Sequence, residues 1–239
     1  AAEEMLKHDT GVLAATTAFG KTVIAAKLIA ERKVSTLVLT HRRQLLTQWT
    51  AKLTEFLDIY EALPVLEKKR GRKKKQSLIG QIGAGKASPS GIIDIAIMQS
   101  LNSGGEVKEW VKNYGMVIVD ECHHVPAFSF EQILKSVHAK YVYGLTATPT
   151  RQDGHHPIIF MHCGPIRYRV DARKQAEKRP FDHYVIPRLT SLRAPLEEEG
   201  KEPSIQRLYA AIAVNEPRNQ RIAEDDLRCF QNGCNALVL

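Results

Sequence analysis

Apolar and polar positions along the first 170 residues predict strands that alternate with helices. Short continuous apolar runs occupy residues 11–15, 35–40, 93–98, 115–120 and 141–147. Between them lie stretches with helical spacing, at about 21–32, 42–57, 107–112 and 130–137. Unbroken apolar runs are typical of parallel strands that are covered on both faces. The pattern therefore predicts an α/β domain over residues 1–170, with a parallel sheet flanked by helices.

The pattern changes after residue 170. Residues 171–203 are polar and charged and carry four spaced prolines, which predicts a connector with little core of its own. Helical spacing returns at about 205–230, with a break expected near 215–217, and the apolar run NALVL follows. We expect residues 204–239 to form the start of a second domain that is cut at Leu239.

The formal net charge of +8 is concentrated in one segment. Residues 67–75 (EKKRGRKKK) contain seven basic residues and one acid, so the rest of the chain is only weakly basic. Such a run is typical of a mobile segment that seeks phosphate or serves in targeting. A solvated loop without a partner explains it equally well, and both interpretations stay open.

Neither membrane insertion nor secretion is indicated. No apolar stretch approaches the roughly 20 residues that a bilayer span needs, and residues 1–10 lack the pattern of a signal peptide. The cysteines do not have the spacing of a disulfide framework or a closed zinc site, so we expect them to be buried or without a special role. They are Cys122, Cys163, Cys229 and Cys234. We expect residence in the cytoplasm, with the nucleoid, or in the nucleus.

A phosphate-binding loop is predicted where the first apolar run meets the first helix. Residues 15–22 read ATTAFGKT, and small residues there let backbone amides converge on phosphates at a helix N-terminus. Lys21 would reach the β- and γ-phosphates of ATP, and the Thr22 hydroxyl would bind Mg²⁺. The predicted nucleotide-binding residues are Thr17, Ala18, Phe19, Gly20, Lys21 and Thr22. The similar sequence at 83–86 opens no helix, and we predict a turn there.

Two acids complete the predicted catalytic site. Asp120 and Glu121 close the apolar run 115–120, and ligands collect at the carboxyl ends of parallel strands. Asp120 would hold Mg²⁺ through water, and Glu121 would act as general base on the attacking water. With Lys21 they form the predicted catalytic group for ATP hydrolysis.

Four segments resemble the motifs of superfamily 2 helicases. ATTAFGKT, LVLTHRRQ, DECHH and LTATP occur in the order and spacing of motifs I, Ia, II and III. The longer stretches VDECHHVPAFSF and YGLTATPTRQDG are most similar to the XPB, UvsW and restriction-motor branch, which acts on duplex DNA. The resemblance implies a RecA-like fold and an ATP-driven motor whose partner is DNA, duplex or single-stranded, with RNA less favoured.

The resemblance also assigns roles outside the nucleotide site. His123, Thr146 and Thr148 would couple the nucleotide state to the grip on nucleic acid, although a packed histidine and ordinary strand-end hydroxyls are the alternatives. The residues implied on the nucleic-acid surface are His41, Arg42, Gln44, Gln99, Ser100 and Arg151. Each of these could instead be a solvated polar residue. The triplet at 151–153 reads RQD where the XPB branch has RED, which puts any role specific to that triplet in doubt.

Other functions compete with a helicase or translocase. The motor subunit of a restriction system would share every motif but needs a nuclease elsewhere in the full protein. A nucleotide-dependent switch or scaffold has no use for a placed general base such as Glu121. A P-loop kinase has no use for DECHH and TATP.

Two elements of the resembled family are expected to lie outside this sequence. They are the adenine-recognition element ahead of the phosphate loop and the arginine finger of the second domain. An arginine finger is typically worth about 10³–10⁵ in rate. We therefore expect the fragment to bind ATP weakly and hydrolyse it very slowly.

Overall fold

The computed structural model describes residues 1–61, 77–103, 106–124, 127–148, 156–171, 186–190 and 204–235. The chain forms two compact units, Ala1–Arg179 and Pro180–Leu239. The basic run 67–75, the residues 151–153 with Arg151, most of the connector and the last four residues lie outside the described ranges. The predicted domain limits at 170 and 203 stay predictions.

The first unit is built on an eight-stranded sheet with the strand order β10-β1-β9-β8-β2-β5-β3-β4. Its paired strands run parallel, except that β4 is antiparallel to β3 at one edge. The predicted parallel sheet is therefore a mostly parallel, mixed one. The strands are β1 (Thr10–Ala14), β2 (Thr36–Thr40), β3 (Ile79–Gly83), β4 (Lys86–Ser88), β5 (Ile93–Ile97), β8 (Met116–Val119), β9 (Tyr141–Thr146) and β10 (Ile166–Arg169).

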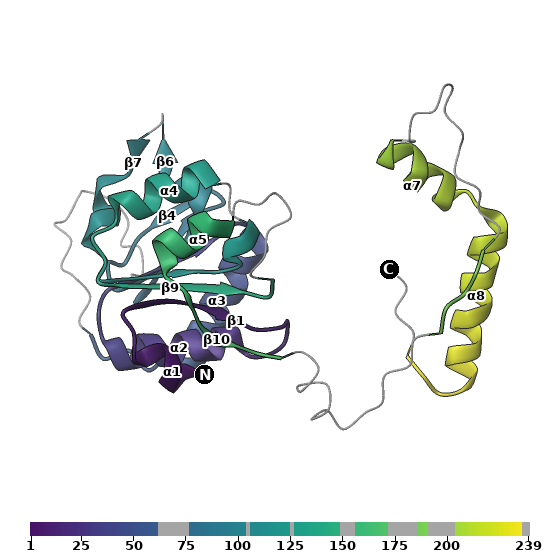
Figure 1. The fold of residues 1–239 in the computed structure, drawn as a ribbon, viewed down its shortest axis with the longest axis horizontal. Helices are drawn as coiled ribbons and strands as arrows, with labels where there is room; N and C mark the ends of the chain where they lie inside the picture. The colour runs from purple at the N-terminus through teal and green to yellow at the C-terminus, as the bar shows by residue number, and fades with distance from the viewer. Residues whose placement is uncertain are drawn as a thin grey trace. The chain divides into compact units, whose positions relative to one another are not determined.

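Helices cover both faces of this sheet (Figure 1). On one face α1 (Ala2–Leu6), α2 (Lys21–Arg32) and α3 (Arg43–Phe56) pack on one apolar cluster of strand side chains. On the other face lie α4 (Ala127–Ser136) and α5 (His156–Cys163), which bury a second cluster. No helix among the described residues has the length and apolar character needed to cross a membrane.

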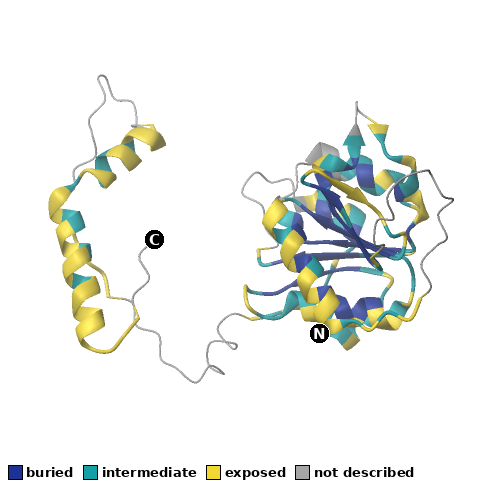
Figure 2. Ribbon diagram, turned by 180° about the vertical axis from the view of Figure 1, so that it is seen from behind, coloured by how far each residue is buried: buried dark blue, intermediate teal, exposed yellow. Residues whose placement is uncertain are grey.

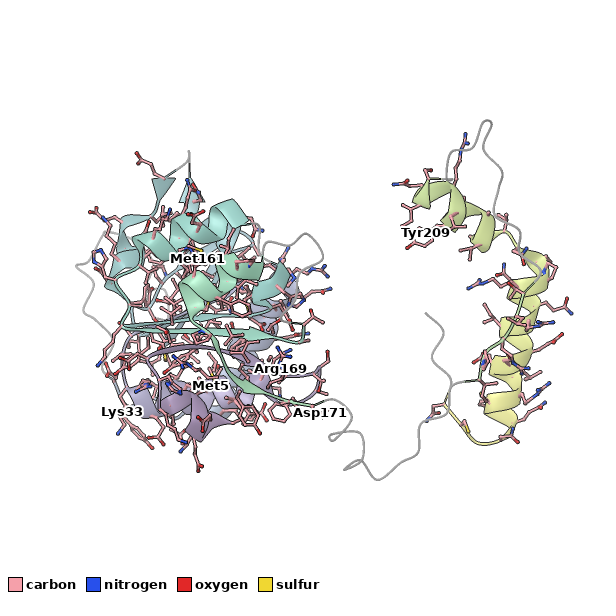
Figure 3. The ribbon with its side chains drawn as sticks, in the orientation of Figure 1. Met5, Lys33, Met161, Arg169, Asp171 and Tyr209 are labelled. Atoms are coloured by element: carbon pink, nitrogen blue, oxygen red, sulfur yellow. The ribbon has the colours of Figure 1, made fainter. Side chains whose placement is uncertain are left out.

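Burial on both faces explains the unbroken apolar runs of the sequence. Every residue of β2 and β8 is buried, and successive side chains alternate between the two clusters. Figure 2 shows these buried strands between the two helical layers. Met5 of α1, labelled in Figure 3, is fully buried in the first cluster, and this packing holds the short helix against the sheet.

Several short elements were not anticipated by the hydrophobic pattern. These are α1, α5, β3, β4, β10 and the two-stranded pair β6 (Asn102–Ser103) and β7 (Glu106–Val107). The helix expected at 107–112 is a 3-10 helix, η2 (Glu109–Asn113), and two further 3-10 turns are η1 (Met98–Ser100) and η3 (Cys122–His124).

The turn predicted at 83–86 is confirmed. It joins β3 to β4 as a tight hairpin, with Ala84 and Gly85 both at positive φ (54° and 80°). That conformation at both central residues is the one that two-residue hairpins favour, because it matches the twist of the strands. The sequence there opens no helix, and it lies apart from the phosphate loop.

A buried carboxylate fixes the start of β5. Asp94 is fully buried and accepts hydrogen bonds from the main-chain N–H groups of Ser90 (2.7 Å) and Gly91 (2.8 Å). It also accepts from the Ser90 hydroxyl (3.1 Å) and the Tyr114 hydroxyl (2.5 Å). Burial, followed by the Asp94 charge, raises the pKa of Tyr114, which therefore stays a proton donor. Asp94 thus ties the loop before β5 to the loop before β8.

Two of the cysteines are core residues. Cys122 and Cys163 are buried, whereas Cys229 and Cys234 are exposed, and all four are free thiols. Burial raises the pKa of the Cys163 thiol to about 12 and that of Cys122 well above its usual range. Both thiols therefore stay protonated and unreactive at neutral pH.

The second unit contains α7 (Ile205–Ala213) and α8 (Glu216–Gln231). The break predicted near 215–217 is confirmed, because the Asn215 side chain accepts a hydrogen bond from Arg218 N and caps the new helix. Neither helix contains a buried residue, and Tyr209 of α7 is exposed (Figure 3).

Candidate functional site

The phosphate loop connects the carboxyl end of β1 to the first turn of α2. Ala18 and Gly20 adopt left-handed backbone conformations (φ 64° and 93°), and Gly20 is the N-cap of α2 without a side-chain cap. The first N–H groups of α2 are therefore left for a ligand, as an anion site at a helix start requires. The Phe19 side chain packs against the core, so only its backbone would be available to a nucleotide.

Lys21 joins the loop to the acidic motif. Its Nζ lies 3.1 Å from Glu121 Oε1 and donates to the carbonyl of Ala15 at 3.3 Å. The side chains of Lys21 and Glu121 are only 11% and 24% exposed, so water screens this ion pair weakly. Two residues that are a hundred positions apart in the sequence thus meet at one point.

Asp120 lies at the end of β8 and is held by two donors. The Trp49 indole Nε1 donates to Oδ2 at 2.7 Å, and the Glu121 main-chain N–H donates to Oδ1 at 3.0 Å. Asp120 is 6% exposed, and this burial raises its pKa. The Trp49 hydrogen bond and the charge of Lys21 lower the pKa, and the charge of Glu121 raises it further.

Glu121 is held in a conformation that non-glycine residues rarely adopt. Its φ is 46°, and such backbone positions typically cost about 1–3 kcal/mol, which the surrounding structure must compensate. Its Oε2 is buried and accepts no hydrogen bond, although His123 Nδ1 lies 3.4 Å away. The strained turn therefore holds one carboxylate oxygen buried beside His123, while the other oxygen pairs with Lys21.

His123 links the acidic motif to the end of β9. Its Nδ1 lies 2.7 Å from Thr146 Oγ1, which also contacts the carbonyl (2.9 Å) and the N–H (3.1 Å) of Thr148. The Thr148 carbonyl can only accept, so the single hydroxyl proton of Thr146 satisfies it. All three bonds form when His123 Nδ1 carries a proton and donates to Thr146, and we assign that tautomer from the network. The three predicted coupling residues are thus in direct contact.

One cavity of about 670 Å³ collects the predicted nucleotide residues. The phosphate loop and the two acids line one part of it, and α3 lines the rest. The lining residues are Thr17, Ala18, Gly20, Lys21, Thr22, Val23, Leu45, Gln48, Trp49, Lys52, Phe56, Asp120 and Glu121. The α3 side chains were not predicted. Trp49 was the one sequence signal for a role of α3 in the site, because a buried indole usually donates its N–H to a hydrogen-bond acceptor.

The oxygen atoms of this cavity fit a magnesium ion that arrives with phosphates. Thr22 and Asp120 supply a hydroxyl and a carboxylate. Magnesium is commonly bound by one or two carboxylates together with substrate phosphates. The described residues contain no group of three or more His, Cys, Asp or Glu side chains that could hold a metal ion without such a ligand.

The predicted nucleic-acid residues follow two neighbouring parallel strands. Residues 41–44 come after β2, and Gln99 and Ser100 come after β5, whose last residue pairs with Thr40. Both segments therefore lie at the same edge of the sheet as the nucleotide cavity. Arg42, Gln44 and Gln99 are exposed, whereas His41 and Ser100 are half-buried.

Comparison with known proteins places this geometry in a family. Residues 1–151 match the family described as type III restriction enzyme, res subunit. The DNA 3'-5' translocase XPB2 of Sulfurisphaera tokodaii is 30% identical over 178 residues, which cover 74% of this chain and 36% of that protein. The chain spans less than half the length of the curated relatives it matches.

Two solved structures have the same fold. The UvsW helicase from bacteriophage T4 superposes with a TM-score of 0.52 at 18% identity, covering 69% of this chain and 57% of UvsW. A nuclease-deletion mutant of the type ISP restriction-modification enzyme LlaGI gives 0.51 at 16% identity, covering 74% of this chain and 20% of LlaGI. At such identities the likeness shows the RecA-like fold alone. With the family match over residues 1–151, the chain belongs to the type III restriction enzyme res subunit family and is a superfamily 2 helicase-type motor domain.

Proposed function

We propose that this chain binds ATP with Mg²⁺, hydrolyses it, and uses the change in nucleotide state to grip and release DNA. The observation that carries the proposal is the meeting of Lys21, Asp120 and Glu121 around one cavity at the carboxyl edge of the sheet. A nucleotide-dependent switch without hydrolysis would not need a strained glutamate whose carboxylate lies beside the phosphate-loop lysine.

Each residue has a separate task in the proposed reaction. Lys21 leaves Glu121 and turns its ammonium group to the phosphates, which carry more negative charge than one carboxylate. The released Glu121 carboxylate accepts a proton from water and orients that water for attack on the γ-phosphate. Thr22 and Asp120 would hold the Mg²⁺ ion, which would supply positive charge to neutralise the phosphate oxygens.

His123 and Thr146 offer a path from this reaction to the end of β9, at the carboxyl ends of the strands. Glu121, His123 and Thr146 form a continuous chain of contacts from the cavity to the end of β9. A change in the position or charge of Glu121 alters what His123 Nδ1 faces. The Thr146 hydroxyl and the main chain of Thr148 would then adjust.

DNA is the proposed partner. One supporting observation is that Arg42, Gln44 and Gln99 are exposed on one edge of the sheet. The other is that the names of two similar proteins state a DNA translocase and a complex with a DNA substrate mimic. Contacts from this edge would be made to backbone phosphates and would carry little base specificity.

A restriction motor is the second candidate. The family description and the LlaGI likeness favour it. A restriction motor requires a nuclease in the same full-length protein, whereas a repair or recombination translocase requires none. Cleavage of DNA that depends on ATP, by the longer protein, distinguishes the two.

The salt dependence of DNA binding tests the proposed interface. Each phosphate neutralised by a cationic side chain contributes about −0.9 to the slope of log K against log salt. We expect Arg42→Ala to reduce the magnitude of this slope by about 1 for duplex DNA of any sequence. Lys140→Ala removes the same charge from the opposite edge of the sheet, just before β9, and should leave the slope unchanged. Equal slopes for the wild type and Arg42→Ala would contradict the proposed interface.

A further inference from the structure

Trp49 makes a polar contact that packing alone does not require. Its ring lies in the apolar cluster with Leu46 and Leu53 and is 3% exposed. Its Nε1 nevertheless points out of this cluster and donates a hydrogen bond to Asp120 Oδ2 at 2.7 Å, which links α3 to the end of β8. Phenylalanine could fill the same apolar position, so the indole N–H has a separate consequence.

The contact restricts the orientation of the Asp120 carboxylate. One oxygen accepts from Trp49 and the other accepts from the Glu121 main chain at 3.0 Å. Rotation about the bond to the carboxylate would break both hydrogen bonds. Each carboxylate oxygen has about two lone-pair directions, so one direction on each oxygen is still available to a ligand.

Trp49 also forms part of the wall of the nucleotide cavity. The same wall includes Leu45, Gln48 and Lys52 of α3, and Asp120 at the end of β8. A donor that holds a metal-binding carboxylate from behind is worth about 10–100-fold in metal affinity or activity in known sites. The placement of Trp49 corresponds to such a donor.

We propose that Trp49 is a positioning residue, whose indole N–H sets the Asp120 carboxylate for the Mg²⁺ ion that accompanies ATP. The inference rests on the proposed function, because it assumes that Asp120 holds this ion. It adds a residue of α3 to the machinery, in the helix whose first residues belong to the proposed DNA-binding segment 41–44. Residues 41–44 and the metal carboxylate are then joined through one rigid helix.

Nucleotide binding with and without Mg²⁺ tests the proposal. A fluorescent ATP analogue is titrated against the wild type, Trp49→Phe and Trp110→Phe, in EDTA and in rising Mg²⁺. Trp49→Phe keeps most of the ring packing but removes the donor. Trp110 belongs to η2 on the other face of the sheet, where it packs edge to face on Tyr114, so its replacement is the matched control.

We expect Trp49→Phe to need roughly tenfold more Mg²⁺ for half-maximal stimulation of nucleotide binding. Its binding in EDTA, and the Mg²⁺ midpoint of Trp110→Phe, should match the wild type. An unchanged midpoint in Trp49→Phe overturns the role of Trp49 and leaves the proposed function standing. Absence of any Mg²⁺ stimulation in the wild type overturns the proposed Mg²⁺ site, and the role of Trp49 with it.

A spectroscopic measurement keeps the test independent of the folding of Trp49→Phe. In Trp110→Phe, Trp49 is the single tryptophan that remains, since the chain has two. We expect its emission to change when Mg²⁺ is added to the nucleotide complex, and this change to vanish in Trp110→Phe/Asp120→Ala. Emission that responds equally with and without Asp120 contradicts the proposal.

Discussion

Replacing Asp94 with asparagine should destabilise the first unit by about 2–4 kcal/mol. Asparagine has nearly the same volume, so the effect isolates the four hydrogen bonds that the buried carboxylate accepts. The amide group replaces one acceptor oxygen by a donor. The hydroxyls of Ser90 and Tyr114 can rotate to new partners, but the main-chain N–H groups of Ser90 and Gly91 cannot.

The magnitude follows from these partners. One partly buried main-chain N–H loses its bond to the buried Asp94 carboxylate, which costs about 1–3 kcal/mol. The remaining bonds become neutral instead of charge-assisted, and each such change weakens a bond by about 1 kcal/mol. Partial relaxation of the loop at 90–91 reduces the sum to about 2–4 kcal/mol.

Urea denaturation followed by tryptophan fluorescence measures this change. Both tryptophans, Trp49 and Trp110, belong to the first unit, so the signal reports that unit. With a slope of about 2 kcal/mol per molar urea, the midpoint should fall by roughly 1–2 M. Glu109→Gln is the control, because Glu109 is 93% exposed and its ion pair is long at 3.8 Å. A midpoint for Asp94→Asn equal to that of the control would refute the reasoning.

Three other substitutions have defined outcomes. Gly80→Ala would place a Cβ 1.8 Å from Asp94 Oδ1, so we expect the free energy of unfolding in the same urea assay to fall by at least about 2 kcal/mol. Because the two residues are in contact, its effect and that of Asp94→Asn should be less than additive in the double variant. Arg32→Met removes the guanidinium donors to the Tyr143 hydroxyl and to two main-chain carbonyls that precede β1. We expect it to lower the free energy of unfolding by about 1–3 kcal/mol and to speed hydrogen exchange in residues 1–8. Exchange there as slow as in the wild type would contradict it. Thr146→Val keeps the side-chain volume but removes the hydroxyl that contacts His123. Binding of the fluorescent nucleotide should persist, but DNA affinity should no longer change when nucleotide is bound. A DNA affinity that still responds to nucleotide would exclude the proposed coupling path.

The sequence was sufficient for the features that local pattern determines. The strands β1, β2, β5, β8 and β9 are covered on both faces and therefore appear as apolar runs. The phosphate loop was recognisable because its residues are contiguous and stand between a strand and a helix. The helix break at Asn215 was recognisable because capping depends on neighbours within three residues.

The features that the sequence did not predict depend on contacts between distant residues. Trp49 and Asp120 are 71 positions apart, and only the fold brings the indole to the carboxylate. The short helix α1 has a single buried residue, Met5, and depends on the tertiary bonds of Arg32 to the carbonyls of Leu6 and His8. The left-handed backbone of Glu121 has no sequence signal, since glycine and asparagine are the usual residues there.

The hydrolysis of ATP under single-turnover conditions tests the central claim most directly. The wild type and Glu121→Gln are compared with radiolabelled ATP and Mg²⁺, because this assay detects slow reactions and counts every cleaved molecule. Removing a general base typically lowers a rate by about 10²–10⁴-fold. We predict slow but measurable hydrolysis by the wild type, and a rate at least a hundredfold lower for Glu121→Gln with fluorescent-nucleotide binding retained. Equal hydrolysis rates for the two proteins would contradict the account of this site.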